Sequence, residues 1–264
     1  MIALRRLASA WFPTAAFAVL LAVGWAFLRA QPAPDAERLH AHWPTLGAHT
    51  LLGQGEGDGV SPATTPAIST QATGSSLITF VASHAVNDKA PTDSKSNAWK
   101  QIGNRVIYRG YESFDVKAYV AVSAKGGSNH TVSVIKPGTE KGELTMPFIE
   151  VRNADVLKDV AQNYPPTGST LTSATVTTTG PATLVAFWWG DGGFKRMEAT
   201  PGDGFTVIEQ FLKLPDNSGV QCAVAYKDVD RAGTYSVTWT NSPAQGAPLW
   251  LFAFQSKGAT PKGE

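Results

Sequence analysis

Short apolar runs that alternate with a period of two dominate residues 68–256 of this chain. In residues 115–122 and 130–135, apolar side chains recur at every second position, as in a strand with one buried face. Turn residues separate such runs, for example Pro137-Gly138. Only residues 153–160 have a helical pattern, and for barely two turns. The sequence therefore predicts an all-β protein.

The spacing predicts about ten or eleven short strands, which is typical of an antiparallel two-sheet β-sandwich. A domain of about 190 residues exceeds an immunoglobulin module of roughly 100 residues, which favours a jelly-roll-like arrangement. Strands and helices do not alternate, so a parallel nucleotide-binding sheet is disfavoured. The apolar runs at residues 77–81 and 249–254 are expected to pair side by side.

The N-terminal hydrophobic segment constrains location. Residues 7–28 carry no charge and follow Arg5 and Arg6, which is typical of a signal peptide or a membrane anchor. The run exceeds the about 7–15 residues of a cleaved hydrophobic region and approaches the roughly 20 of a spanning helix. Both forms stay open, with the retained anchor favoured. We expect a protein that is membrane-anchored and faces the periplasm or cell exterior, or is secreted.

The expected organisation has four parts. Residues 1–30 form the signal peptide or anchor, 31–65 a Gly/Pro-rich tether, 66–257 the β-sandwich domain, and 258–264 a flexible tail. Glycine and proline resist packing into regular structure, which supports the tether. Its apolar middle, residues 36–52, could instead form a short helix or a first strand.

Charge and cysteine content exclude some classes of protein. The net charge of +1 argues against a nucleic-acid partner, since such binders concentrate basic side chains on one face. Cys222 is the sole cysteine, so no intrachain disulfide can form. An exported domain without disulfides suits a bacterial envelope protein. The chain contains no nucleophile elbow, zinc-protease motif or Walker loop.

The most distinctive polar loop spans residues 87–99. Its candidate ligand-binding residues are Asn87, Asp88, Asp93, Asn97 and Trp99. The carboxylate and amide oxygens of Asp and Asn side chains can bond to sugar hydroxyls or to a hard cation. The same side chains also cap their own turns, which is the alternative interpretation. Calcium wants six to eight oxygens, and the loop lacks EF-hand spacing. The sequence therefore predicts no cofactor, with calcium as the alternative.

A second candidate lies where an apolar strand run ends at Trp188-Trp189 and a loop begins with Asp191. Neighbouring strand residues point to opposite faces, so one indole could face solvent and stack on a sugar ring. We select Trp189 and Asp191, with Tyr108 and Tyr111 as further aromatic candidates. Filling of the core is the alternative for each aromatic.

The order of an apolar first strand, the Pro-Thr-Asp-Ser-x-x-Asn-x-Trp loop at residues 91–99 and aromatic-rich strands resembles jelly-roll domains of bacterial secreted and phage-tail proteins. The resemblance spans roughly residues 68–256. It implies a lectin-like or surface-adhesion role and carries over no catalytic residues.

Three functions stay open. The first is a non-enzymatic binding or adhesion module for a surface or extracellular glycan. The second is a glycan-cleaving hydrolase, which needs two carboxylates about 5–10 Å apart, drawn from Glu112, Asp115 or Glu150. The third is a structural subunit of a surface appendage. Glu143 is expected to be a solvated loop charge, and Glu150 to form a surface ion pair with Arg152.

Overall fold

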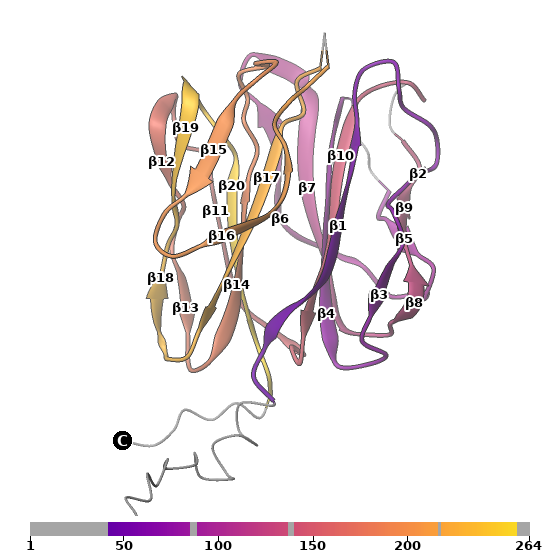
Figure 1. Ribbon diagram of the computed structural model, residues 1–264, viewed down its shortest axis with the longest axis vertical. Coiled ribbons are helices and arrows are strands. Elements are labelled where there is room, and N and C mark those ends of the chain that lie inside the picture. The colour runs from indigo at the N-terminus through magenta and orange to yellow at the C-terminus, as the bar shows by residue number, and fades with distance from the viewer. Residues whose placement is uncertain (1–41, 85–88, 137–139, 216–217, 258–264) are drawn as a thin grey trace, which may run out of the picture.

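The computed structural model describes residues 42–84, 89–136, 140–215 and 218–257. They form antiparallel strands and no helix, and two five-stranded sheets pack face to face (Figure 1). The first sheet has the order β1 (Thr45–Gln54), β10 (Leu144–Arg152), β4 (Ser75–His84), β7 (Tyr111–Ala124), β6 (Lys100–Tyr108). The second has the order β11 (Val156–Asn163), β20 (Leu249–Gln255), β14 (Ala182–Trp188), β17 (Cys222–Val229), β16 (Thr206–Phe211). The predicted antiparallel β-sandwich is confirmed.

Shorter strands cover the outer side of each main sheet (Figure 1). Outside the first sheet lie β2 (Ala63–Thr64), β9 (Val132–Val134) and β5 (Thr92–Asp93), with the pair β3 (Ile68–Thr70) and β8 (Gly127–His130). Outside the second lie β12 (Gly168–Thr172), β19 (Thr238–Gln245) and β15 (Glu198–Pro201), with the pair β13 (Val176–Thr178) and β18 (Gly233–Tyr235). Because both faces are covered, every residue of β14 is buried.

The central core lies between the two main sheets and is rich in aromatic rings. The Phe80 ring on β4 stacks 4.4 Å from that of Trp189, centroid to centroid, and meets Trp250 edge-on at 5.3 Å. Successive side chains of β14 point alternately into two clusters. Phe187 belongs to the central core, and Trp188 belongs to a second cluster between the second main sheet and its outer strands. The period-two pattern therefore decides which core each side chain enters.

The structure corrects the predicted tether for residues 45–65. Strand β1 pairs with β10 from Thr45 opposite Arg152 to Gln54 opposite Leu144. Leu46 and Leu51 of β1 pack against the central core. Their burial stabilises a strand in a segment whose glycine content disfavours regular structure. Of the alternatives for residues 36–52, the first strand is therefore correct over the described part. Residues 31–41 lie outside the described residues.

Two other local expectations are wrong. The helical pattern at residues 153–160 falls largely in β11, whose pairing with β20 extends from Val156 to Asn163. The runs at 77–81 and 249–254 do not pair, because β4 lies between β10 and β7 while β20 lies between β11 and β14. These two strands instead face each other across the core. Tertiary pairing overrides weak local propensity here.

Both ends of the described chain leave the sandwich together, at the bottom of Figure 1. The Ser256 hydroxyl donates a hydrogen bond of 2.7 Å to the His42 carbonyl oxygen. The hydrophobic segment at residues 1–30 and the tail at 258–264 lie outside the described residues. Within the described residues, no helix has the length and apolar character needed to cross a membrane.

Candidate ligand pocket at one end of the sandwich

In the predicted polar loop, the carboxylate of Asp93 is an internal anchor. Its side chain has 0% exposure. Oδ1 accepts hydrogen bonds from the backbone amides of Lys95 at 2.7 Å and Asn97 at 3.3 Å, and Oδ2 accepts one from Trp99 Nε1 at 2.7 Å. His130 Nε2 lies 3.5 Å from Oδ1. The residues Asp93, Asn97, Trp99 and His130 are called the Asp93 cluster below.

These contacts determine the charge of Asp93. Burial by itself raises the pKa of Asp93, but the interaction with His130 and the hydrogen bonds from Lys95, Asn97 and Trp99 outweigh it and lower the pKa to about 2. The Asn97 side chain also donates to the Lys125 carbonyl oxygen at 2.9 Å. The structure thus brings three predicted site residues together, but they bond to one another and to the backbone.

Two of the predicted loop residues, Asn87 and Asp88, lie outside the described residues. Among the residues that are described, no group of three or more His, Cys, Asp or Glu side chains is placed to hold a metal ion. The hydrogen bonds that Asp93 accepts from Lys95, Asn97 and Trp99 are those of a structural anchor for the loop.

The expectation of a solvent-facing indole at the end of β14 is corrected. Trp188 and Trp189 do point to opposite faces, but both are 0% exposed. Each face of β14 is covered by another layer, so Trp189 is not available to stack on a ligand.

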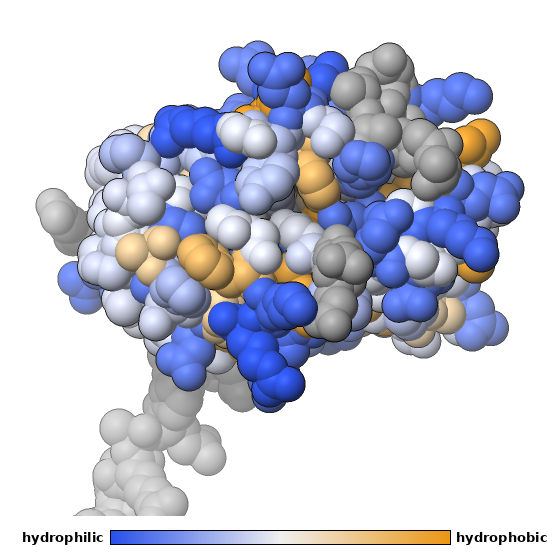
Figure 2. Space-filling model, turned by 90° about the horizontal axis from the view of Figure 1, so that it is seen from above, coloured by the Kyte–Doolittle hydropathy of each residue, from blue (hydrophilic) through white to orange (hydrophobic). Residues whose placement is uncertain are grey.

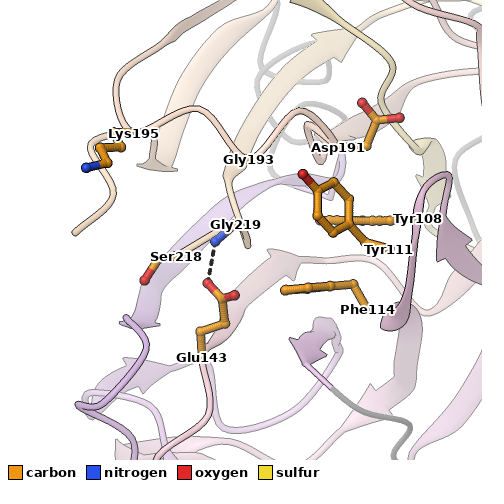
Figure 3. A pocket seen from close by; sticks show the side chains of 9 residues that line it. All are labelled: Tyr108, Tyr111, Phe114, Glu143, Asp191, Gly193, Lys195, Ser218 and Gly219. Atoms are coloured by element: carbon orange, nitrogen blue, oxygen red, sulfur yellow. Dashed lines mark hydrogen bonds between the residues drawn. The ribbon is translucent and has the colours of Figure 1, made fainter. Parts of the chain in front are cut away.

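Figure 3 shows a pocket, whose volume is about 290 Å³. The pocket lies at the other end of the sandwich from the chain ends. Strand β1 begins at Thr45, near the described start of the chain, and ends at Gln54, which pairs with Leu144. Glu143 immediately precedes Leu144 and therefore lies at the end of the sandwich away from the chain ends. Four segments that are distant in sequence line the pocket: the β6–β7 hairpin, residues 191–195, residues 218–219 and Glu143.

The β6–β7 hairpin supplies an aromatic wall. Tyr108 and Tyr111 pair across a tight turn in which Gly110 has a φ of +77°, a conformation that favours glycine. The Tyr108 and Phe114 rings stack with centroids 5.7 Å apart, and the Tyr111 ring meets Phe114 edge-on at 5.8 Å. Tyr111 is 49% exposed, so its ring is accessible at the mouth of the pocket.

Glu143 forms a fixed carboxyl group in this pocket, which corrects its expected place as a solvated loop charge. The side chain is 3% exposed. Its Oε2 accepts hydrogen bonds from the backbone amides of Gly219 at 2.5 Å and Val220 at 3.2 Å. Figure 3 shows the other oxygen turned toward the Phe114 ring. Burial raises the pKa of Glu143, against the effect of these two amides.

Asp191 is a predicted site residue that the structure brings to the pocket, together with the further candidates Tyr108 and Tyr111. Its Oδ2 accepts a hydrogen bond of 2.6 Å from the Tyr164 hydroxyl. That hydroxyl accepts one of 2.9 Å from the Arg109 amide, and the Arg109 guanidinium lies 4.0 Å from the Tyr164 ring centroid. The second carboxylate of the pocket is thus also held in place, by Tyr164.

Tyr108 is the buried member of the aromatic wall. It is 3% exposed, and its hydroxyl makes no hydrogen bond to any of the residues that the structure describes. Burial raises the pKa of Tyr108 well above its ordinary value, so the phenol stays neutral.

The carboxylates considered for hydrolysis lie outside the lining of this pocket. Glu112 is exposed, whereas Asp115 is buried with Arg105 Nε 3.1 Å from its Oδ2. The expected ion pair of Glu150 with Arg152 is present, but Glu150 itself is fully buried, so the pair is not a surface one on the Glu150 side. The residue accepts hydrogen bonds from Gln71 N at 2.6 Å, Ser75 Oγ at 2.7 Å and Ala48 N at 3.1 Å, while Arg152 Nε lies 3.4 Å away. These contacts make Glu150 a structural link between β10 and its neighbours.

Sequence reasoning missed Glu143, Phe114 and Lys195 as pocket residues, and only tertiary packing distinguishes Glu143 from its solvated neighbours. A scan against protein-family models found no match to this chain. Searches of curated proteins and of solved structures also gave no significant match. The geometry of the pocket is therefore the observation from which a function can be argued.

Proposed function

We propose that this domain is a non-enzymatic binding module that takes a carbohydrate in the pocket between Tyr111, Glu143 and Asp191. The observation that carries the proposal is an accessible aromatic ring beside two immobilised carboxyl groups. Sugars offer apolar ring faces that stack on aromatic side chains, together with hydroxyls that bond to carboxylates. In the Asp93 cluster, by contrast, both oxygens of the carboxylate are already hydrogen-bonded within the loop.

The position of the pocket supports a role in presentation to the outside. Both chain ends leave the opposite end of the sandwich (Figure 1). If residues 1–30 form the expected anchor, the pocket faces away from the membrane, toward a surface or extracellular glycan. Figure 2 shows this distal end from above, where apolar side chains are set among polar ones. We include the membrane-anchored or secreted location in the proposal.

The substitution Tyr111→Ala tests the proposal. We expect it to weaken glycan binding about tenfold, which corresponds to the loss of one aromatic contact. Folding should be retained because the side chain is half exposed. A glycan array would find the ligand, and titration calorimetry with the full chain would measure the loss.

The matched control is Val122→Ala, which removes a side chain of similar exposure (48%, against 49% for Tyr111) near the other end of β7. Its binding should equal that of the wild type. Absence of any glycan signal for the wild type, or full affinity in Tyr111→Ala, would contradict the proposal. If the protein is a structural subunit, the wild type would give no glycan signal and would assemble.

A glycan-cleaving hydrolase is the second candidate, and one observation favours it. Glu143 and Asp191 line the same pocket, and burial raises the pKa of Glu143, as a general acid requires. This pair replaces Glu112, Asp115 and Glu150 as the hydrolytic candidates. Release of reducing ends that is lost in Glu143→Gln would favour this function over simple binding.

A further inference from the structure

The size and walls of the pocket limit what part of a glycan can enter. Its volume of about 290 Å³ lies at the lower limit of the about 300–1,000 Å³ of pockets that enclose drug-sized ligands. Four separate chain segments surround it. Such a space suits one sugar ring entering from the mouth at Tyr111.

Glu143 is a rigid polar group in this space. Its Oε2 is bonded to the amides of Gly219 and Val220, so rotation of the carboxyl group would break both hydrogen bonds. The aromatic wall lies next to it, because the position that a Cβ would take at Gly219 is 3.8 Å from the Phe114 ring and 3.9 Å from Glu143 Oε1. Figure 3 shows the same neighbourhood, with Oε1 toward Phe114.

A fixed acceptor beside an aromatic ring selects a particular ligand surface. The ligand must offer an apolar face to the aromatic wall and, at the edge of that face, a hydroxyl that can donate to Oε1. A ring hydroxyl of a sugar satisfies both conditions. A hydroxyl that is methylated or already part of a glycosidic bond cannot donate.

We propose that the pocket binds the single terminal ring of a glycan and that Glu143 determines specificity by accepting a hydrogen bond from a hydroxyl of that ring. This inference rests on the proposed function and adds the part of the glycan that is recognised. It implies that the end of the glycan chain binds, while internal segments do not fit.

The first experiment requires no variant. Methyl glycosides of the terminal sugar compete against the glycan found on the array, alongside derivatives in which each hydroxyl in turn is O-methylated. We expect the simple glycoside to compete and one O-methyl derivative to bind about tenfold more weakly. Enzymatic removal of the terminal sugar should abolish binding.

The variant Glu143→Gln identifies the residue responsible. Its amide oxygen can still accept from Gly219 and Val220, while its amino group replaces Oε1, so that an acceptor becomes a donor. We expect about tenfold weaker binding, no discrimination against the critical O-methyl derivative and an unchanged fold. The control is Glu140→Gln, which changes an exposed neighbouring carboxylate and should bind as the wild type.

Two results would overturn this inference while the proposed function survives. One is glycan binding that needs Tyr111 but is equal in Glu143→Gln and the wild type, with unchanged discrimination among the derivatives. The other is competition by internal fragments as strong as that by the terminal sugar. A wild-type protein that binds no glycan would overturn both proposals together.

Discussion

The Asp93 cluster and the distal pocket contain the same kinds of side chain but use them in opposite ways. In the cluster, both oxygens of Asp93 accept hydrogen bonds, from Lys95, Asn97 and the Trp99 indole. In the pocket, the hydrogen bonds that the Glu143 carboxyl group accepts from the described residues fall on Oε2, and its other oxygen is turned toward Phe114. The first arrangement stabilises a loop, and the second leaves an acceptor for a ligand.

Asp, Asn and Trp side chains at close spacing can bind a ligand only if their polar atoms are not already hydrogen-bonded within the loop. The Asp93 loop is compact in sequence, so its side chains reach each other and the nearby backbone. The pocket residues come from distant segments: the Gly219 amide donates to Oε2 of Glu143, while the other Glu143 oxygen is turned toward Phe114.

The largest expected effect separates the two regions by stability. Asp93→Ala removes a buried carboxylate and leaves the Trp99 indole and two amides without their acceptor, which should lower the free energy of unfolding by about 3 kcal/mol. Asp191→Ala loses one side-chain hydrogen bond, from Tyr164, and should cost about 1 kcal/mol. Urea denaturation measures both. Equal losses would remove the distinction between anchor and pocket.

The pH dependence of stability should have opposite signs in the two regions. The pKa of Asp93 falls from 3.8 to about 2 on folding. The contribution of ionised Asp93 to the free energy of unfolding is therefore present above pH 3.8 and is lost as the pH falls toward 2. The pKa of Glu143 is raised from 4.5, so its contribution is present below pH 4.5 and is lost as the pH rises through the folded value.

Unfolding measured from pH 2 to pH 7 would check these signs. The free energy of unfolding of Asp93→Asn should be lower than that of the wild type, and this difference should shrink as the pH falls from 3.8 to 2. The free energy of unfolding of Glu143→Gln should rise relative to that of the wild type as the pH rises above 4.5. If the difference from the wild type stays constant with pH in both variants, the assigned environments are contradicted.

The smallest expected effect concerns Tyr108, the buried residue of the pocket's aromatic wall. The Tyr108 hydroxyl is buried without a hydrogen bond to the described residues, so Tyr108→Phe should change the free energy of unfolding by less than about 0.5 kcal/mol, or raise it slightly. Differential scanning calorimetry of the two proteins would show this. A loss above about 1 kcal/mol would mean that the hydroxyl has a stabilising partner.

Local patterns predicted the fold class but not its connections. Alternation at residues 115–122 predicted a strand that the structure contains as part of β7. The pairing of β20 with β14 and β11 could not be predicted, because any apolar strand can pair with any other until the whole sheet is assembled. The same reason explains β11, where the partner strand converts a weak helical pattern into a strand.

The candidate site was predicted only in part. Asp191 was selected, with Tyr108 and Tyr111 as further candidates, because carboxylates can bond to sugar hydroxyls and exposed aromatic rings can stack on sugars, and the structure places all three at the pocket. Trp189 was selected on the same grounds and is buried, because the outer strands cover both faces of β14. Glu143 carries no local signal that separates it from Glu140.

The sequence by itself determined that this chain forms antiparallel strands, since period-two alternation and turn residues act over a few neighbouring positions. Tertiary structure alone decided which carboxylates are anchors and which line a pocket. Glu143 and Gly219 are separated by 76 positions yet share a hydrogen bond. Burial and hydrogen-bond satisfaction depend on such distant partners, which exist only when the layers have packed.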